Sequence, residues 1–411
     1  GMNVFKATTR GLAYFIYFND NPASPNIQLH FASGLVNGVA ESGKTTSTQW
    51  QNMIDNSIYS KIDVMSRYTH TVARKDHLAS FNPTSPQELM DQYDRVQKGE
   101  LDFMGFFKYN KPINNRMFIM VEGSGGYFAG GTGVHLDSSW GLPNLFAPNG
   151  LDFWGIPHEF GHINQVRPDI KWHGTTEVTT NIYSAWTYYH MANFGSSTRH
   201  MRLESETGGK TLYPSVSANR YGEFFKAVTI GGANSMAFTD DVAFRRLVPF
   251  WQLSMYYSLA GAAKGAPVLP FDYNMQDEGL VPHHVPTEFT DGVDYARWYA
   301  TITDKAQKST DSWSLSSGQL AMNFVKNVSD AVQEDLTDFF VKAGFLVPVS
   351  VSIDDYGVST FTVTQEMVDE AKNYIKSKGY KKPVSPVMNY ISAFSIQAFK
   401  NQLPVAGVTG V

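Results

Sequence analysis

The chain has 411 residues, of which 42% are hydrophobic and 17% are charged, and its formal net charge at pH 7 is −5. This length is sufficient for two or three domains, and the negative charge gives no reason to expect a nucleic-acid partner. The sequence contains no cysteine, which excludes disulfides, thiolate metal sites and a cysteine nucleophile. No stretch approaches the roughly 18–20 apolar residues that a membrane span requires.

Residues 1–150 show mainly strand-like patterns with two helical stretches. The segment 27–31 alternates apolar and polar side chains, which is typical of a strand with one face in water. Ser85-Pro86 suits the N-cap and first residue of a helix. The elements expected in this part are helices at 49–62 and 85–98 and strands at 12–18, 27–31, 68–73 and 116–122, the last of them buried.

Residues 38–45, with the sequence GVAESGKT, match the phosphate-binding pattern G-x-x-x-x-G-K-[ST]. A phosphate loop requires a preceding strand buried on both faces and a helix that begins at the Lys-Thr pair. The preceding strand instead carries the polar residues Gln28 and His30, and Ser47 or Thr48 is the better N-cap for the next helix. We therefore interpret the match as a turn and expect no bound nucleotide.

The stretch 123–133, GSGGYFAGGTG, is rich in glycine but lacks the lysine of a phosphate loop. Glycine in a strand permits close approach of another backbone. The stretch therefore suits an edge strand that binds a peptide by strand addition, and a plain hairpin turn is the alternative.

Residues 158–162 are His-Glu-Phe-Gly-His, which is the H-E-x-x-H pattern. Positions i and i+4 of a helix share one face, so His158 and His162 can present two imidazole nitrogens to one Zn²⁺ at about 2.0–2.1 Å. Glu159 is rotated off the metal, where it can hold the metal's water and take its proton. Two core histidines beside a solvated glutamate are the alternative interpretation.

The sequence around the motif predicts a helix over 153–166. Pro157 suits a first helical turn, and the residue before Pro168 is unfavourable for continuing the helix. Gly161 is unfavourable in the middle of a helix, which indicates close approach of another element or of a substrate. One face of the helix is expected to pack inward through Phe153, Ile156, Phe160 and Ile163.

A catalytic zinc site needs three protein ligands and a water, so a third ligand must accompany the two histidines. The metzincin pattern would place a glycine at position 165 and a histidine at position 168. Gln165 and Pro168 stand there instead, which excludes that class. Asp169 and His173 are possible ligands further along the chain.

Glu177 is the preferred third ligand. It follows Thr175-Thr176, which are good N-cap residues, and begins a helix expected over 176–192. A carboxylate in the first turn of a helix is also favoured by the helix dipole. Asn181 lies one turn later on the same face, where it can orient a ligand or a substrate backbone or be a simple surface amide.

These two segments together resemble the enhancin-like zinc metallopeptidase family. That family combines H-E-x-x-H with a ligand glutamate in an E-V-T-x-N stretch, as residues 158–165 and 177–184 do here. Weaker similarity extends the resemblance to roughly residues 11–345, through 11–16, the surroundings of Trp50 and Tyr68, 249–253 and 335–340. The resemblance implies a gluzincin-type zincin in which His158, His162 and Glu177 bind zinc and Glu159 is the catalytic acid and base.

After residue 150 the expected elements are mainly helical, at 153–166, 176–192, 218–230, 241–261, 292–308, 315–328, 330–343 and 364–378, with a strand from Val347. We predict an α+β fold with a mixed β-sheet N-terminal part and a mainly helical C-terminal part. The predicted division has three pieces. They are β-strands at 1–35, which belong to the catalytic sheet or to a trimmed β-domain, a zinc peptidase catalytic domain at 36–345, and a small C-terminal α/β extension at 346–411.

The expected activity is that of a zinc-dependent endopeptidase. The resemblance to the gut-bacterial branch of the family implies a secreted or cell-surface bacterial enzyme that cuts O-glycosylated, mucin-like proteins. The alternatives are a catalytically weak glycan-binding surface protein and a general metalloprotease that needs no glycan. We expect a monomer without a membrane span. Because the chain begins Gly1-Met2 without a signal peptide, we also expect that a leader has been removed.

Two parts of the expected active site stay open. Tyr183 or a histidine is the candidate for stabilising the oxyanion, and His135, His283 and His284 are left unassigned. No residue is assigned to glycan binding, although eight Trp and 21 Tyr suit stacking on sugar rings.

Overall fold

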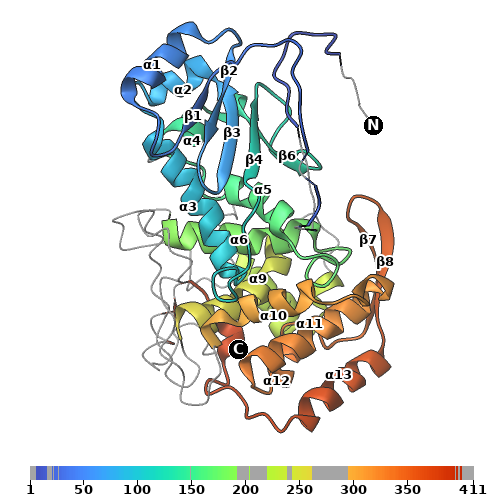
Figure 1. Ribbon diagram of the computed structural model, residues 1–411. Coiled ribbons are helices and arrows are strands. Elements are labelled where there is room, and N and C mark those ends of the chain that lie inside the picture. Colours follow the sequence, from blue (N-terminus) through green and yellow to red (C-terminus); the bar gives the residue numbers. More distant parts are fainter. Residues whose placement is uncertain are drawn as a thin grey trace.

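A computed structural model describes residues 6–15, 21, 23–25, 27–148, 150–191, 203, 220–237, 243–261, 295–393, 395–396 and 399. Within these residues the fold is α+β, with a mixed sheet in the N-terminal part and helices in the C-terminal part (Figure 1). None of the helices in these ranges is both long and apolar enough to cross a membrane.

The described part of the chain forms a six-stranded sheet with the order β1-β2-β3-β4-β6-β5. Its strands are β1 Val39–Glu41, β2 Lys61–Met65, β3 Thr69–Arg74, β4 Met117–Glu122, β5 Phe128–Gly130 and β6 Gly133–Asp137. Strand β2 pairs parallel with β1 and antiparallel with β3, whereas β4 is parallel to both neighbours, β3 and β6. Strand β5 returns antiparallel to β6, which leaves β5 at the edge of the sheet.

Helices and the sheet share one apolar core in the N-terminal part. Alternate residues of β4 are buried, and they pack with Trp50, on the helix between β1 and β2, and with Phe160, on a helix that follows the last strand of the sheet. The helices of this part are α1 Ser47–Asn56, α2 Lys75–Phe81, α3 Gln87–Phe103, α4 Pro143–Phe146 and α5 Gly155–Asn164. Helix α5, which carries the H-E-x-x-H motif, thereby lies against the edge of the sheet formed by β5 and β6.

The C-terminal part is built mainly from helices around a second, strongly aromatic core. Its regular elements are α6 Thr176–Met191, α8 Arg220–Phe224, α9 Ala243–Leu253, α10 Trp298–Gln307, α11 Ser317–Val332, α12 Thr337–Lys342, β7 Val349–Asp354, β8 Val358–Val363 and α13 Gln365–Ser377. Strands β7 and β8 form an antiparallel hairpin whose residues Ile353, Phe361 and Val363 are buried in this core. The tip of the hairpin points back toward the level of α5 and α6 (Figure 1).

The strands expected at 12–18 and 27–31 are not formed at their described residues, and positions 16–18 lie outside the described ranges. The alternating segment instead runs over the surface, with Ile27, Leu29 and Phe31 at least half exposed. A strand needs a neighbour that satisfies its N–H and C=O groups, and no described strand pairs with this segment. An alternating pattern alone was therefore insufficient to predict a strand.

The helix expected at 49–62 is shorter, because α1 ends at Asn56 and residues 61–65 form β2. Its N-cap is Thr46, rather than Ser47 or Thr48. The Thr46 side chain accepts from the Gln49 N–H, and the Gln49 side chain accepts from the Thr46 N–H. The helix thus begins after the G-K-T stretch and not within it. Within residues 38–45, Val39–Glu41 form strand β1, which was not expected. The expected turn is confined to residues 42–44, where Lys44 pairs with Glu41 at 2.6 Å.

The helix expected at 330–343 begins only at Thr337, because α11 continues to Val332 and ends where Gln333 adopts a left-handed φ of 49°. The strands expected at 68–73 and 116–122 and the helices expected at 153–166, 176–192 and 364–378 are formed within a few residues of the expected bounds. The division at residue 345 stays a prediction.

Candidate metal centre

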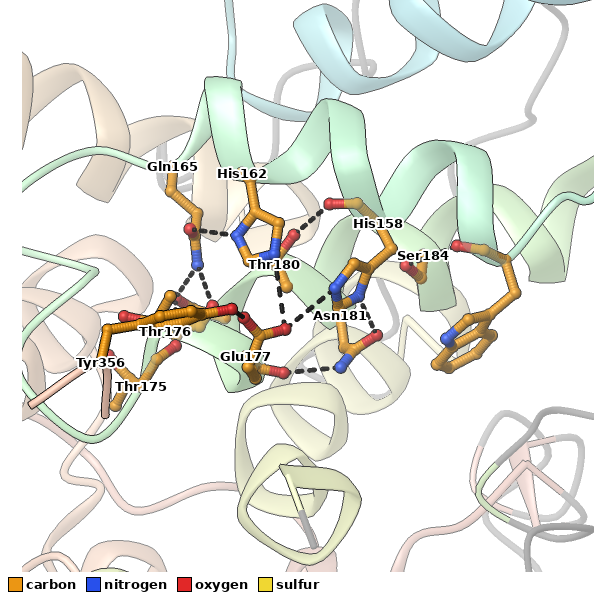
Figure 2. Close-up of polar contacts among 12 residues, drawn as sticks. His158, His162, Gln165, Thr175, Thr176, Glu177, Thr180, Asn181, Ser184 and Tyr356 are labelled. Atoms are coloured by element: carbon orange, nitrogen blue, oxygen red, sulfur yellow. Dashed lines mark hydrogen bonds and ion pairs between the residues drawn. The ribbon is translucent and has the colours of Figure 1, made fainter. Parts of the chain in front are cut away.

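Helices α5 and α6 lie side by side and supply the three candidate ligands (Figure 2). Their close approach explains the mid-helix glycine. A Cβ at Gly161 would lie 2.6 Å from Thr180 Oγ1 and 2.9 Å from the Thr180 carbonyl oxygen. The Thr180 hydroxyl also donates to the His158 carbonyl oxygen. These contacts fix the first histidine of α5 relative to the first turns of α6.

The side chains of His158, His162 and Glu177 converge on one point. Glu177 Oε2 lies 3.0 Å from His158 Nε2 and 3.4 Å from His162 Nε2. Among the described residues, these three form the only group of three or more potential ligands whose atoms lie within 4.8 Å of one another. The sequence prediction that Glu177 joins the two histidines agrees with this geometry.

The donor set and its spacing fit a zinc ion. Ligand atoms about 2.0–2.1 Å from a tetrahedral ion stand about 3.3–3.4 Å apart, close to both observed distances. Burial acts to raise the pKa of Glu177, but hydrogen bonds with His158 and His162 outweigh it and hold this pKa well below its usual range. Glu177 is therefore an anion that faces two imidazole nitrogens, an arrangement consistent with the His₂Glu ligand set found in catalytic zinc sites.

Amide side chains orient both imidazoles. Asn181 Oδ1 lies 2.9 Å from His158 Nδ1, and the Asn181 amide donates to the Glu177 carbonyl oxygen at 2.6 Å. Gln165 Oε1 lies 3.3 Å from His162 Nδ1, and its amide nitrogen donates to α6. An acceptor at Nδ1 favours the tautomer whose Nε2 is free to bind a metal. Asn181 thus has the orienting position that its spacing predicted.

Glu159 lies beside this group with little exposure to solvent. Burial raises its pKa to about 7, and only 5% of the residue is exposed. Its Oε2 atom is buried and has no hydrogen-bond partner among the described protein atoms. A carboxylate oxygen that has no protein partner and belongs to a residue lining a cavity can accept a hydrogen bond from a water molecule or a substrate.

A cavity of about 790 Å³ opens over these residues. One wall is the edge strand β5 with its neighbours Tyr127 and Gly131, and another contains Arg167, Lys171 and Tyr356. Burial, followed by the charge of Arg167, lowers the pKa of Lys171 to about 8. The glycine-rich stretch 123–133 therefore forms part of the cleft, as its composition indicated, and also makes the hairpin between β5 and β6.

The rival ligands have other partners. Asp169 accepts from the Ser312 hydroxyl at 2.7 Å, and His173 Nε2 bonds to the Ile353 carbonyl oxygen at 3.0 Å. His135 stacks on Phe128, and its Nε2 lies 3.1 Å from Thr132 Oγ1. His283 and His284 lie outside the described residues.

Tyr183, which was one candidate for the oxyanion group beside a histidine, is fully buried and does not line the cavity. Its hydroxyl donates to the Asn164 carbonyl oxygen at 3.3 Å and accepts from Tyr299 at 3.1 Å. The structure instead brings Tyr356 to the site, where its hydroxyl donates to Glu177 Oε1 at 2.7 Å (Figure 2). This hydrogen bond raises the pKa of Tyr356 to about 12, so the hydroxyl keeps its proton at neutral pH.

The site combines an H-E-x-x-H helix, a glutamate on the adjacent helix and a neighbouring sheet edge. This combination is typical of metallopeptidases. The sequence profile described as Peptidase M60, enhancin and enhancin-like, matches residues 37–344. The chain therefore belongs to this family. A comparison with curated protein sequences gives no match.

Several solved structures have a similar fold. A metallopeptidase in complex with Tn antigen is 19% identical with a TM-score of 0.65, over 88% of this chain and 59% of that chain. A metallopeptidase from Bacteroides thetaiotaomicron is 18% identical with a TM-score of 0.65, over 87% and 53%. The catalytic domain of ZmpC from Clostridium perfringens, in complex with the sialyl T antigen, is 17% identical with a TM-score of 0.53, over 87% and 58%. The chain thus spans less than two thirds of each of these proteins, and the likeness shows the fold.

Proposed function

We propose that the chain is a zinc-dependent endopeptidase that cleaves O-glycosylated, mucin-like proteins outside the cell, where it is secreted or surface-bound. The observation that carries the proposal is the convergence of His158, His162 and Glu177 beside a buried Glu159 whose Oε2 has no protein partner. The cavity over these residues is bounded by an exposed sheet edge, as a peptide-binding cleft requires.

His158, His162 and Glu177 would hold the zinc. When bound, zinc supplies a Lewis acid that polarises the scissile carbonyl and makes water a stronger acid. Glu159 takes a proton from the attacking water and passes it to the amine nitrogen of the departing peptide. A pKa raised to about 7 by burial suits a group that must both accept and release a proton near neutral pH.

The cleft geometry supports a peptide substrate bound in extended form. Strand β5 pairs with β6 on one side only among the described strands, so its other edge can add a substrate strand. Next to it, Trp140 is 59% exposed and stacks on Tyr127, a residue that lines the cavity. Exposed aromatic faces suit sugar rings. Together with similar structures in complex with the Tn and sialyl T antigens, they support a glycosylated substrate.

The test compares one threonine-containing peptide with and without O-linked N-acetylgalactosamine, using the zinc-loaded protein and Glu159→Gln. We expect cleavage of the glycopeptide that a chelator abolishes and added zinc restores. Glu159→Gln should keep its zinc but lose about 100-fold or more in rate, because it removes the proton acceptor without changing the shape of the side chain.

Each other outcome identifies an alternative. Equal cleavage of both peptides would favour a general metalloprotease, and glycan binding with bound zinc but no cleavage would favour a surface glycan-binding protein. Full activity of Glu159→Gln would rule out the proposed mechanism.

A further inference from the structure

The β7–β8 hairpin reaches the metal centre from a distant part of the sequence. Its tip contains Asp355 and Tyr356, and Tyr356 adopts a left-handed φ of 58°. Although Tyr356 is 85% exposed, its hydroxyl donates a hydrogen bond to Glu177 Oε1. The two residues are 179 positions apart in the sequence. The hairpin begins at Val349, beyond residue 344 where the family match ends.

The hairpin makes further contacts with the turn that leads into α6. Asp355 Oδ2 accepts from the backbone N–H of Gly174 at 2.7 Å and of Thr176 at 3.2 Å. The first N–H groups of a helix have no partner within the helix, so Asp355 supplies a cap from outside α6. The approach is close, because a Cβ at Gly174 would lie 3.0 Å from the Ile353 side chain.

The two oxygens of Glu177 have different partners. Oε2 faces both imidazole Nε2 atoms, at 3.0 and 3.4 Å, whereas Oε1 accepts the Tyr356 hydroxyl at 2.7 Å. Figure 2 shows Tyr356 on the side of Glu177 away from His158. A carboxylate held in this way presents one oxygen to the point where the ligand atoms converge.

We propose that Asp355 and Tyr356 are positioning residues, which hold Glu177 so that it binds the metal through Oε2 alone. This inference rests on the proposed role of Glu177 as a ligand. Without the Tyr356 hydroxyl, the Glu177 carboxylate can rotate and turn Oε1 toward the position of the metal. Oε1 would then take a coordination position that a water molecule needs. Losing an outer hydrogen bond to a ligand typically costs about 10–100-fold in metal affinity or activity.

The test uses Tyr356→Phe, which removes one exposed hydroxyl and keeps the ring. Tyr374→Phe is the matched control, because the Tyr374 hydroxyl also donates to a carboxylate, Asp330 Oδ2, at 2.7 Å but lies on α13. For each protein we would measure zinc affinity by competition with a chromogenic chelator, the visible spectrum of the Co²⁺ form, and thermal unfolding without metal.

We expect Tyr356→Phe to bind zinc about 10–100-fold more weakly and to show an altered Co²⁺ spectrum, with unchanged unfolding of the metal-free protein. Tyr374→Phe should match the wild type in metal affinity and spectrum. Asp355→Asn should weaken zinc binding in the same direction, because it replaces a charged acceptor at the N-terminus of α6 with a neutral one. If Tyr356→Phe had the zinc affinity and the Co²⁺ spectrum of the wild type, this inference would be overturned, but the proposed function would not be. Failure of the wild type to bind zinc would overturn the proposed function as well.

Discussion

At the scale of single residues, the two histidines depend on side chains that never touch the metal position. Asn181 and Gln165 place amide oxygens at the Nδ1 atoms of His158 and His162, so each Nε2 faces Glu177. Both amides also bond to the backbone of α6 or to Thr179 on it. The ligand geometry is thus tied to the packing of α5 on α6.

Gly161→Ala tests that packing. A Cβ there would meet Thr180 Oγ1 at 2.6 Å and the Thr180 carbonyl oxygen at 2.9 Å, and backbone cannot yield as a flexible side chain can. We expect the free energy of unfolding to fall by about 1–3 kcal/mol, despite the better helix propensity of alanine of about 1 kcal/mol. Thermal or urea denaturation would measure the change.

Gly123→Ala is the control, because a Cβ at Gly123 meets nothing within 4 Å. It should leave the unfolding free energy nearly unchanged. If Gly161→Ala proved as stable as the wild type, the close approach of α5 and α6 would not be the reason for the glycine.

The spacing of residues in the sequence was sufficient to predict some of the residues of the candidate site, but not others. His158 and His162 follow from the i, i+4 geometry of one helix, and Glu177 follows from its place in the first turn of the next. Tyr356 could not be predicted, because its contact with Glu177 joins positions 179 residues apart and depends on where the hairpin docks. Tyr183, one of the open candidates for the oxyanion group, faces the core, which its nearness in sequence to Glu177 did not reveal.

At the scale of elements, helix α3 supports the end of α5 through a buried carboxyl. Asn164 donates from its amide to Glu100 Oε2 at 2.7 Å, and Glu100 is fully buried. Burial, opposed only by this hydrogen bond, raises the pKa of Glu100 well above its usual value. Glu100 is therefore protonated in the fold at pH values where the unfolded chain would have released the proton.

This linkage predicts how Glu100→Gln changes stability with pH. Above about pH 4.3 the unfolded state loses the Glu100 proton and the folded state keeps it, so the carboxyl lowers the unfolding free energy as pH rises toward its folded pKa. Glutamine cannot ionise and can still accept from Asn164. The stability of Glu100→Gln relative to wild type should therefore increase with pH, by up to about 1.4 kcal/mol per pH unit in that window.

Urea denaturation of both zinc-loaded proteins at several pH values from about 4 to about 7 would measure this difference. A stability difference that stays constant over the range would show that Glu100 is ionised in the fold.

The elements themselves were predictable where a local signal coincided with packing. The helix at 155–164 has Pro157 in its first turn, and the helix at 176–191 begins at the good N-cap residues Thr175-Thr176. Both have an apolar face, and both form. The segment 27–31 has the alternation of a strand but no partner, and the five-residue strand β2 was hidden at the end of an expected helix. Pairing between strands is a property of the whole sheet, which a single segment does not contain.

At the scale of the whole molecule, the candidate active site joins three parts of the chain. The cavity is lined by the edge strand β5, by residues of helices α5 and α6, and by Tyr356 of the β7–β8 hairpin. The ligands come from two helices whose relative position depends on both hydrophobic cores, since Phe160 packs in one and Val178 and Ile182 in the other.

Metal binding should therefore stabilise the whole fold. A ligand that binds only the folded state adds about 4 kcal/mol at a free concentration of about 1,000 times its dissociation constant. We expect added zinc to raise the melting temperature of the metal-free protein and a chelator to reverse the change. In Glu177→Ala, which lacks the third ligand, the zinc-dependent rise should largely disappear, and an undiminished rise would place the stabilising zinc elsewhere.

The most direct test of the central claim is a crystal structure of the zinc-loaded protein with anomalous diffraction at the zinc absorption edge. We predict one zinc ion within about 2.0–2.2 Å of His158 Nε2, His162 Nε2 and Glu177 Oε2, with Glu159 directed toward the open coordination position. Absence of zinc from this point, or zinc held there without Glu177, would contradict the account.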